Sequence, residues 1–95
     1  MRRAPRIDAT QNDIVDVLRR MGASVLSLAA IGKGCPDILV CYRQKLYLVE
    51  IKDGATNWKM TPAQTKFHAE WKGPIGLLDG SDAAVMWINR LAKMP

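Results

Sequence analysis

Histidine and cysteine are scarce in this chain of 95 residues, which has one histidine, His68, and two cysteines, Cys35 and Cys41. The cysteines form no Cys-x-x-Cys pair, so a closed zinc site lacks ligands, and neither residue is marked as a nucleophile. Unpaired thiols of this kind indicate a reducing, cytoplasmic compartment. We interpret His68 as a surface or packing residue, because a lone histidine gives no basis for a histidine-metal site.

Long apolar runs are also missing. No run approaches the ~20 apolar residues that a membrane span needs, and no apolar segment of a secretory signal follows the first arginines. The length predicts one domain, 1–95, with one core. A chain of this size rarely encloses a deep pocket, so an active site is expected on an open surface or completed by a second copy.

The charge is positive, with 14 Lys and Arg against 9 Asp and Glu and a net charge of +5. This surplus indicates a polyanionic partner. Part of it lies in residues 1–7, a basic N-terminal arm in which Arg2, Arg3 and Arg6 are candidates to bind DNA phosphates. The alternative is a solvated, frayed terminus. Lys33, between two glycines, is either a further phosphate contact or a solvated loop lysine.

Three segments carry helical signals. Apolar spacing predicts a first helix over 8–21. A second helix is expected from Thr61 to about Trp71, because Thr61 suits the N-cap, a proline follows it and Gln64 stands three residues on. A third helix begins at 80–82. Its predicted apolar stripe consists of Val85, Ile88, Leu91 and Ala92.

Short apolar segments between these helices predict strands. They lie at residues 23–31, 38–42, 45–52 and 75–79, and the second and third are joined by a two-residue turn as a hairpin. The resulting order is α-β-β-β-α-β-α. It predicts an α/β fold with one mixed sheet of about four strands and helices on its faces.

Two carboxylates at the hairpin carry the chemical signal. Asp37 stands at the start of one strand and Glu50 near the end of its neighbour, so antiparallel pairing brings them to one end of the sheet. Two close carboxylates repel each other and favour a hard cation such as Mg²⁺. Side chains alternate between the two faces of a strand, so those of Glu50 and Lys52 share one face and that of Ile51 points to the core. The main-chain carbonyl of Ile51 can still offer its oxygen to a cation.

An acid pair, a lysine and a carbonyl suit metal-assisted phosphodiester hydrolysis. The metal polarises the phosphate and lowers the pKa of water, while the lysine offsets developing charge. The alternative is structural: Pro-Asp and Glu-x-Lys also occur as a turn residue and a solvated pair. The chain would then be a small basic nucleic-acid-binding protein without catalysis.

The same residues resemble a known family. Pro36-Asp37 followed by Glu50-Ile51-Lys52 on adjacent strands is similar to the PD-(D/E)XK nuclease superfamily. The Gly-Lys-Gly loop at 32–34, which precedes Asp37, and the Thr-Pro-Ala-Gln helix start at 61–64 resemble the VRR-NUC subgroup of this superfamily, as found in small phage or prophage proteins. The resemblance covers about residues 7–80. It implies a restriction-endonuclease-like core and, for a phage or prophage protein, the cytoplasm of a bacterial host.

The resemblance also implies roles for single residues. Asp37 and Glu50 would bind the metal together with the Ile51 carbonyl, and Lys52 would be the catalytic lysine. Gln64 would hold the site or a phosphate, although a capping box explains it equally well. Many relatives have a glutamate in the first helix, where this chain offers Asp8 and Gln11; these two are alternatively an N-cap and its partner.

The leading prediction is therefore a Mg²⁺-dependent DNA endonuclease, with Mn²⁺ as a substitute. No helix rich in base-reading side chains stands out, so it is expected to read DNA shape and backbone. By resemblance the substrate would be branched, such as a Holliday junction or flap. Symmetric cutting of a junction needs two sites and predicts a homodimer. Trp58 is the tryptophan best placed to touch DNA or a partner subunit, whereas Trp71 and Trp87 are expected as core or interface anchors.

Overall fold

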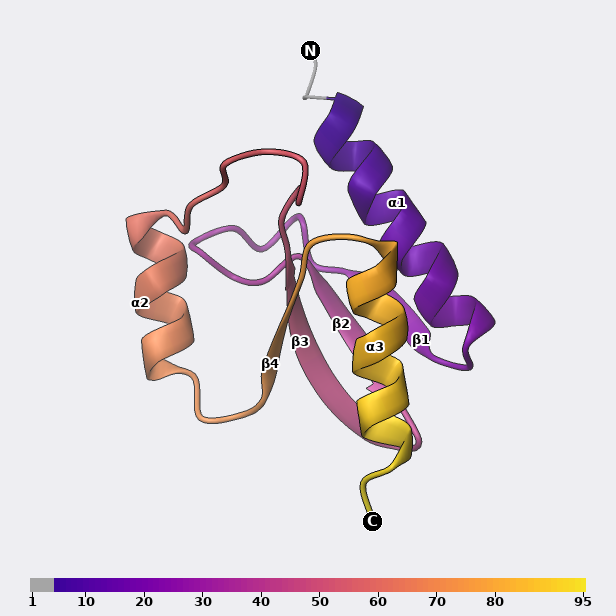
Figure 1. Cartoon of the computed structure of the whole chain (residues 1–95). Coiled ribbons are helices and arrows are strands. Elements are labelled where there is room, and N and C mark those ends of the chain that lie inside the picture. The colour runs from indigo at the N-terminus through magenta and orange to yellow at the C-terminus, as the bar shows by residue number, and fades with distance from the viewer. Residues whose placement is uncertain (1–4) are drawn as a thin grey trace.

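The computed structural model describes residues 5–95, and for residues 5–8 only the main chain. The predicted order of elements is confirmed (Figure 1). The helices are α1 (Pro5–Arg20), α2 (Pro62–Glu70) and α3 (Ser81–Ala92), and the strands are β1 (Ser24–Ser27), β2 (Ile38–Tyr42), β3 (Lys45–Ile51) and β4 (Ile75–Leu78).

The four strands form one mixed sheet in the order β1-β2-β3-β4, as predicted. The first two pairings are antiparallel, and β4 lies parallel to β3. Arg43 and Gln44 form the turn between β2 and β3 with positive φ values of 52° and 70°, as a two-residue hairpin turn requires. β1 ends at Ser27, earlier than predicted. Leu28 still donates its N–H to the Asp37 carbonyl at 2.9 Å, but the chain then turns, and the Ile31 N–H donates to the Leu28 carbonyl at 3.0 Å.

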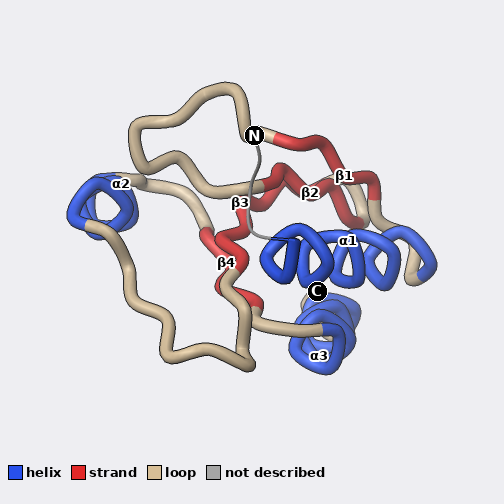
Figure 2. Tube along the Cα trace, turned by 90° about the horizontal axis from the view of Figure 1, so that it is seen from above, coloured by secondary structure: helices blue, strands red, loops and turns tan. Residues whose placement is uncertain are grey.

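Helices α1 and α3 pack side by side on one face of the sheet (Figure 2). The core lies beneath them. Trp87 of α3 is buried there, edge-on to Tyr47 with ring centroids 5.4 Å apart. The absence of a side chain at Gly76 makes this possible, because a Cβ there would lie 3.2 Å from the Trp87 ring. The other core side chains include Ile14, Leu18, Val25, Ile38, Val40, Val49, Ile51, Leu78, Ala84, Ile88 and Leu91.

The predicted stripe of α3 is partly wrong. Ile88 and Leu91 are buried, but Val85 and Ala92 are exposed, and Ala84 and Trp87 take their place in the core. Both sets follow helical spacing around Ile88, so the periodicity does not choose between them. The tight contact of Trp87 with the sheet rotates the helix to the second set.

Helix α2 stands on the other side of the sheet, away from α1 and α3 (Figures 1 and 2). It begins with the predicted capping box, in which Thr61 and Gln64 each accept from the other's backbone N–H. None of its residues is buried. Within residues 5–95 no helix is long and apolar enough to cross a bilayer.

Candidate active site

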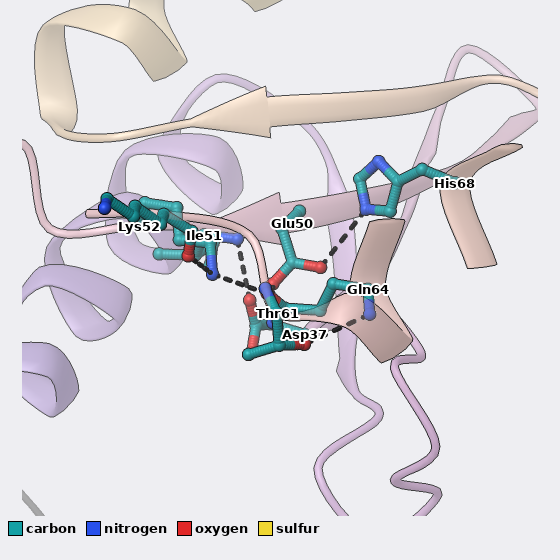
Figure 3. A network of polar contacts seen from close by, with 8 residues as sticks. Asp37, Glu50, Ile51, Lys52, Thr61, Gln64 and His68 are labelled. Atoms are coloured by element: carbon teal, nitrogen blue, oxygen red, sulfur yellow. Dashed lines mark hydrogen bonds and ion pairs between the residues drawn. The ribbon is translucent and has the colours of Figure 1, made fainter. Parts of the chain in front are cut away.

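Asp37 lies immediately before β2 and is held against the end of β3. Its backbone N–H donates to the Val49 carbonyl at 3.0 Å, which continues the ladder one residue beyond the strand. Its carboxylate oxygen Oδ2 accepts from the N–H of Ile51 at 2.7 Å. The Asp37 side chain is thereby fixed beside Glu50, as the predicted hairpin requires (Figure 3).

Glu50 is the most unusual residue of the sheet, because its carboxyl group is only 1% exposed. Its neighbours Val49 and Ile51 point into the core, so Glu50 points to the opposite face. Burial first, and then the hydrogen bond and the negative charge of Asp37, raise the pKa of Glu50 to about 8, against the opposing effect of Lys52. The ionised pair is therefore costly until a positive charge approaches it.

Gln64 joins the helix cap to the two charged residues. Its Oε1 accepts from Lys52 Nζ at 2.7 Å and from the Thr61 N–H at 2.9 Å, while its Nε2 donates to Glu50 Oε2 at 3.2 Å. Lys52 Nζ also donates to the carbonyl of Lys59 at 3.2 Å. Gln64 therefore completes the cap of α2 and contacts Lys52 and Glu50 at the same time.

His68 belongs to this cluster, which the sequence interpretation missed. Its Nε2 lies 3.3 Å from Glu50 Oε1, and its ring is 22% exposed (Figure 3). Burial, and then the charge of Lys52, lower the pKa of His68, so near neutral pH the contact is a hydrogen bond of a neutral ring rather than an ion pair. The available signal was its spacing of four from Gln64, which places both on one side of α2.

The glycine loop before Asp37 packs directly against the start of α2. Gly34 has a φ of +79°, and a Cβ there would overlap the carbonyl of Ala63 and lie 2.9 Å from the nitrogen of Gln64. Only glycine fits both conditions. The loop thus positions Lys33 at a groove of about 270 Å³, whose other lining residues are Ala63, Lys66, Phe67 and the acidic Glu70 of α2.

No described side chain of the first helix, residues 9–20, hydrogen-bonds to Asp37, Glu50 or Lys52. α1 begins at Pro5, so Asp8 lies inside the helix and is not its N-cap, and Arg6 lies in the helix rather than in an arm. The side chains of both, and residues Arg2 and Arg3 entirely, lie outside the described part. Gln11 is half-buried, and within residues 9–95 no hydrogen bond joins it to Asp37, Glu50 or Lys52.

The cysteines and tryptophans take different places. Cys35 lies beside the site, where burial, and then the charges of Glu50 and Asp37, raise the pKa of its thiol. This disfavours the reactive thiolate, in line with the expectation that it is no nucleophile. Trp87 is in the core, as expected. Trp58 is half-buried in its loop, and Trp71 is exposed and stacked on Phe67 at 5.3 Å.

The donor set fits a hard cation better than zinc. Across the described side chains no group of three or more His, Cys, Asp or Glu is placed to hold a metal ion. What is present is one carboxylate pair beside a strand end. Mg²⁺ commonly takes one or two carboxylates, and completes its six ligands with water and substrate phosphate. The raised pKa of Glu50 indicates that such a cation would stabilise the pair.

Comparisons with known proteins agree with this architecture. No family model and no curated protein matches the chain. A solved structure described as a VRR_NUC domain is similar, with a TM-score of 0.70. It is 23% identical in sequence, and the match covers 88% of this chain and 95% of that chain. The chain therefore has the fold of a VRR_NUC domain, which is the fold that its motifs suggested.

Proposed function

We propose that this chain is a metal-dependent endonuclease that hydrolyses phosphodiester bonds of DNA. The observation that carries the proposal is the meeting of Asp37, Glu50 and Lys52 at one end of the sheet, with Gln64 bonded to two of them. The fold of a VRR_NUC domain supports it. Asp37, Glu50 and the Ile51 carbonyl would hold Mg²⁺, or Mn²⁺ in its place.

The bound cation would supply charge to polarise the phosphate and to lower the pKa of water. The protein's own part is to keep its groups in position. Gln64 and His68 fix the two oxygens of Glu50, and the Ile51 N–H fixes one oxygen of Asp37. Lys52, held by Gln64 and by the Lys59 carbonyl, keeps an ammonium group where negative charge develops on the phosphate.

The DNA backbone is expected to run along α2 past Lys33 and Lys66. Neither lysine is ion-paired in the described part of the structure, and both line the groove beside the site. Contacts of this kind bind phosphates and carry no sequence information. We therefore propose selection of DNA by shape, with branched DNA such as a junction or flap as the substrate, and a homodimer as the form that cuts both strands.

Cleavage assays with Mg²⁺ and with Mn²⁺ on duplex, flap and four-way DNA test this function. Asp37→Ala, Glu50→Ala and Lys52→Ala should each lower the rate on the order of 10²–10³-fold or more, while DNA is still bound. Asp16→Ala and Lys72→Ala are matched controls, because both residues are exposed away from the site. If no substrate is cut with either metal, the chain is a non-catalytic nucleic-acid-binding protein instead.

A further inference from the structure

The groove beside α2 combines two lysines with an aromatic ring. We call it the α2 groove; its volume is about 270 Å³, and it is lined by Lys33, Ala63, Lys66, Phe67 and Glu70. The four residues from α2 follow a spacing of three and four and therefore share one side of the helix. Lys33 comes from the glycine loop, which reaches across to the start of α2 (Figure 1). The groove thus forms only where this loop and the helix meet.

The aromatic ring of the α2 groove belongs to a stacked pair outside the core. The rings of Phe67 and Trp71 lie 5.3 Å apart with only 16° between their planes. No residue of α2 is buried, so the pair is not part of the apolar core. A Cβ at Gly73 would lie 2.9 Å from Nε1 of Trp71, so the indole also packs closely on the main chain. Trp71 does not line the groove, so the groove meets the part of the Phe67 ring that Trp71 leaves free.

The charged residues of the α2 groove are arranged along the helix. Lys33 and Lys66 are both exposed, and neither forms an ion pair in the part of the chain that the structure describes. Glu70 lies one turn beyond Lys66, toward the end of α2, and its carboxylate would repel a phosphate. A nucleic-acid backbone is therefore attracted to the end of the groove with the lysines. Phosphate contacts alone, however, leave the aromatic ring without a ligand.

The size of the α2 groove suits a nucleobase. A cavity of about 150 Å³ is enough to hold benzene, so 270 Å³ has room for a base and part of its sugar. Bases of a duplex are stacked on each other, whereas unpaired bases stack readily on aromatic side chains beside a basic groove. We propose that the α2 groove binds one unpaired nucleotide of a DNA strand. Its base stacks on Phe67, and its phosphates lie at Lys33 and Lys66.

The groove and the candidate active site share one helix. Gln64 and His68, which contact Glu50, each follow a groove residue by one position, so they lie on the adjacent side of α2. A helix with its side chains is ~10 Å wide, so a strand held in the groove passes close to Glu50. Among branched substrates this favours a flap, which has unpaired nucleotides, over a fully paired four-way junction. This preference rests on the proposed function, whereas base binding in the groove is measured without cleavage.

Fluorescence anisotropy without a divalent metal tests the stacking. One probe is a duplex with a short unpaired thymidine tail. The other has the same tail built of abasic nucleotides, which keep the phosphates but remove the bases. The wild type should bind the thymidine tail roughly 10-fold more tightly than the abasic tail. Phe67→Leu should remove this difference, because leucine is apolar but has no ring. Phe67→Tyr should keep it, because tyrosine stacks equally well.

Two further variants control for folding and position. Ala63→Leu fills the groove from an exposed helical position that tolerates leucine, so it should also remove the difference if Phe67→Leu does not fold. Trp58→Leu is the matched control, because Trp58 is another half-buried aromatic residue but does not line the groove. This variant should keep the difference between the tails. Circular dichroism checks the fold of each variant.

Each outcome decides either the groove or the function. Equal affinity of the wild type for both tails, or a difference that survives Phe67→Leu and Ala63→Leu, overturns base binding in the groove even if the protein cleaves DNA. Loss of the difference in Trp58→Leu alone would place the unpaired strand over the loop before α2 and would overturn it as well. Conversely, a difference that both groove variants remove, in a protein that cuts no DNA with Mg²⁺ or Mn²⁺, supports the groove and overturns the proposed function.

Discussion

The two faces of the sheet differ in what their side chains contribute: one face forms the core, and the other carries the candidate active site. On the face under α1 and α3, Val49 and Ile51 are buried among apolar side chains. On the other face, Leu46 is 60% exposed, and the carboxyl group of Glu50 is buried beside that of Asp37. The first arrangement stabilises the fold. The second leaves a carboxyl pair whose ionisation is unfavourable in the metal-free protein, and the cation of the proposed function would reduce this cost.

Substitutions at the adjacent residues Val49 and Glu50 of β3 should give the largest and opposite changes in stability. Val49→Ala should destabilise the protein by roughly 2–3 kcal/mol at any pH, because it opens a cavity in the core. Glu50→Gln should instead stabilise the metal-free protein at pH 8, since a neutral amide removes the cost of the buried charge. Both changes are measured by denaturant unfolding.

The pH dependence follows from the sign of the Glu50 shift. Its pKa rises from 4.5 to about 8 on folding, so between these values the folded chain binds more protons than the unfolded one. The stability of the metal-free wild type should therefore fall as pH rises from 5 to 8, by on the order of a few kcal/mol. Mg²⁺ should reduce this slope, and Glu50→Gln should abolish it. A wild-type profile that stays flat without metal would contradict the account of the buried pair.

A smaller effect separates the two roles of Gln64. Thr61→Ala and Gln64→Ala each remove half of the capping box and should cost about 1 kcal/mol of stability. Only Gln64→Ala also releases Lys52 and Glu50, so it alone should lower the cleavage rate, by roughly 10–100-fold. Equal rates for the two variants would show that Gln64 acts only as a cap.

The smallest expected effect concerns DNA binding beside the site. Lys66→Ala should weaken DNA binding a few-fold for all sequences. It should also lower the slope of the logarithm of the binding constant against the logarithm of the salt concentration by about 1, the value for one phosphate contact. Lys72→Ala should change the salt dependence less, because Lys72 does not line the groove. Fluorescence anisotropy over a salt series measures both. If the two variants showed the same salt dependence of DNA binding, the DNA would not run along the groove lined by Lys33 and Lys66.

Local patterns were sufficient for much of the fold. The hairpin, the cap of α2 and the order of elements depend on neighbouring residues, and all were predictable. The wrong stripe of α3 and the early end of β1 depend on contacts made across the sheet, by Trp87 with Gly76 and by Ser27 with Ile38. His68 was missed for the same reason, because its partner Glu50 is 18 residues away.

The sequence by itself determined that Asp37 and Glu50 meet, since a two-residue turn and the period of two leave a hairpin one register. Only the tertiary structure decided how deeply Glu50 is buried and that α2 closes over it with Gln64 and His68. It also decided that α1 and α3 together cover one face, while α2 stands alone on the other side (Figure 2). Burial and layer arrangement depend on where distant segments pack, and no local pattern carries that information.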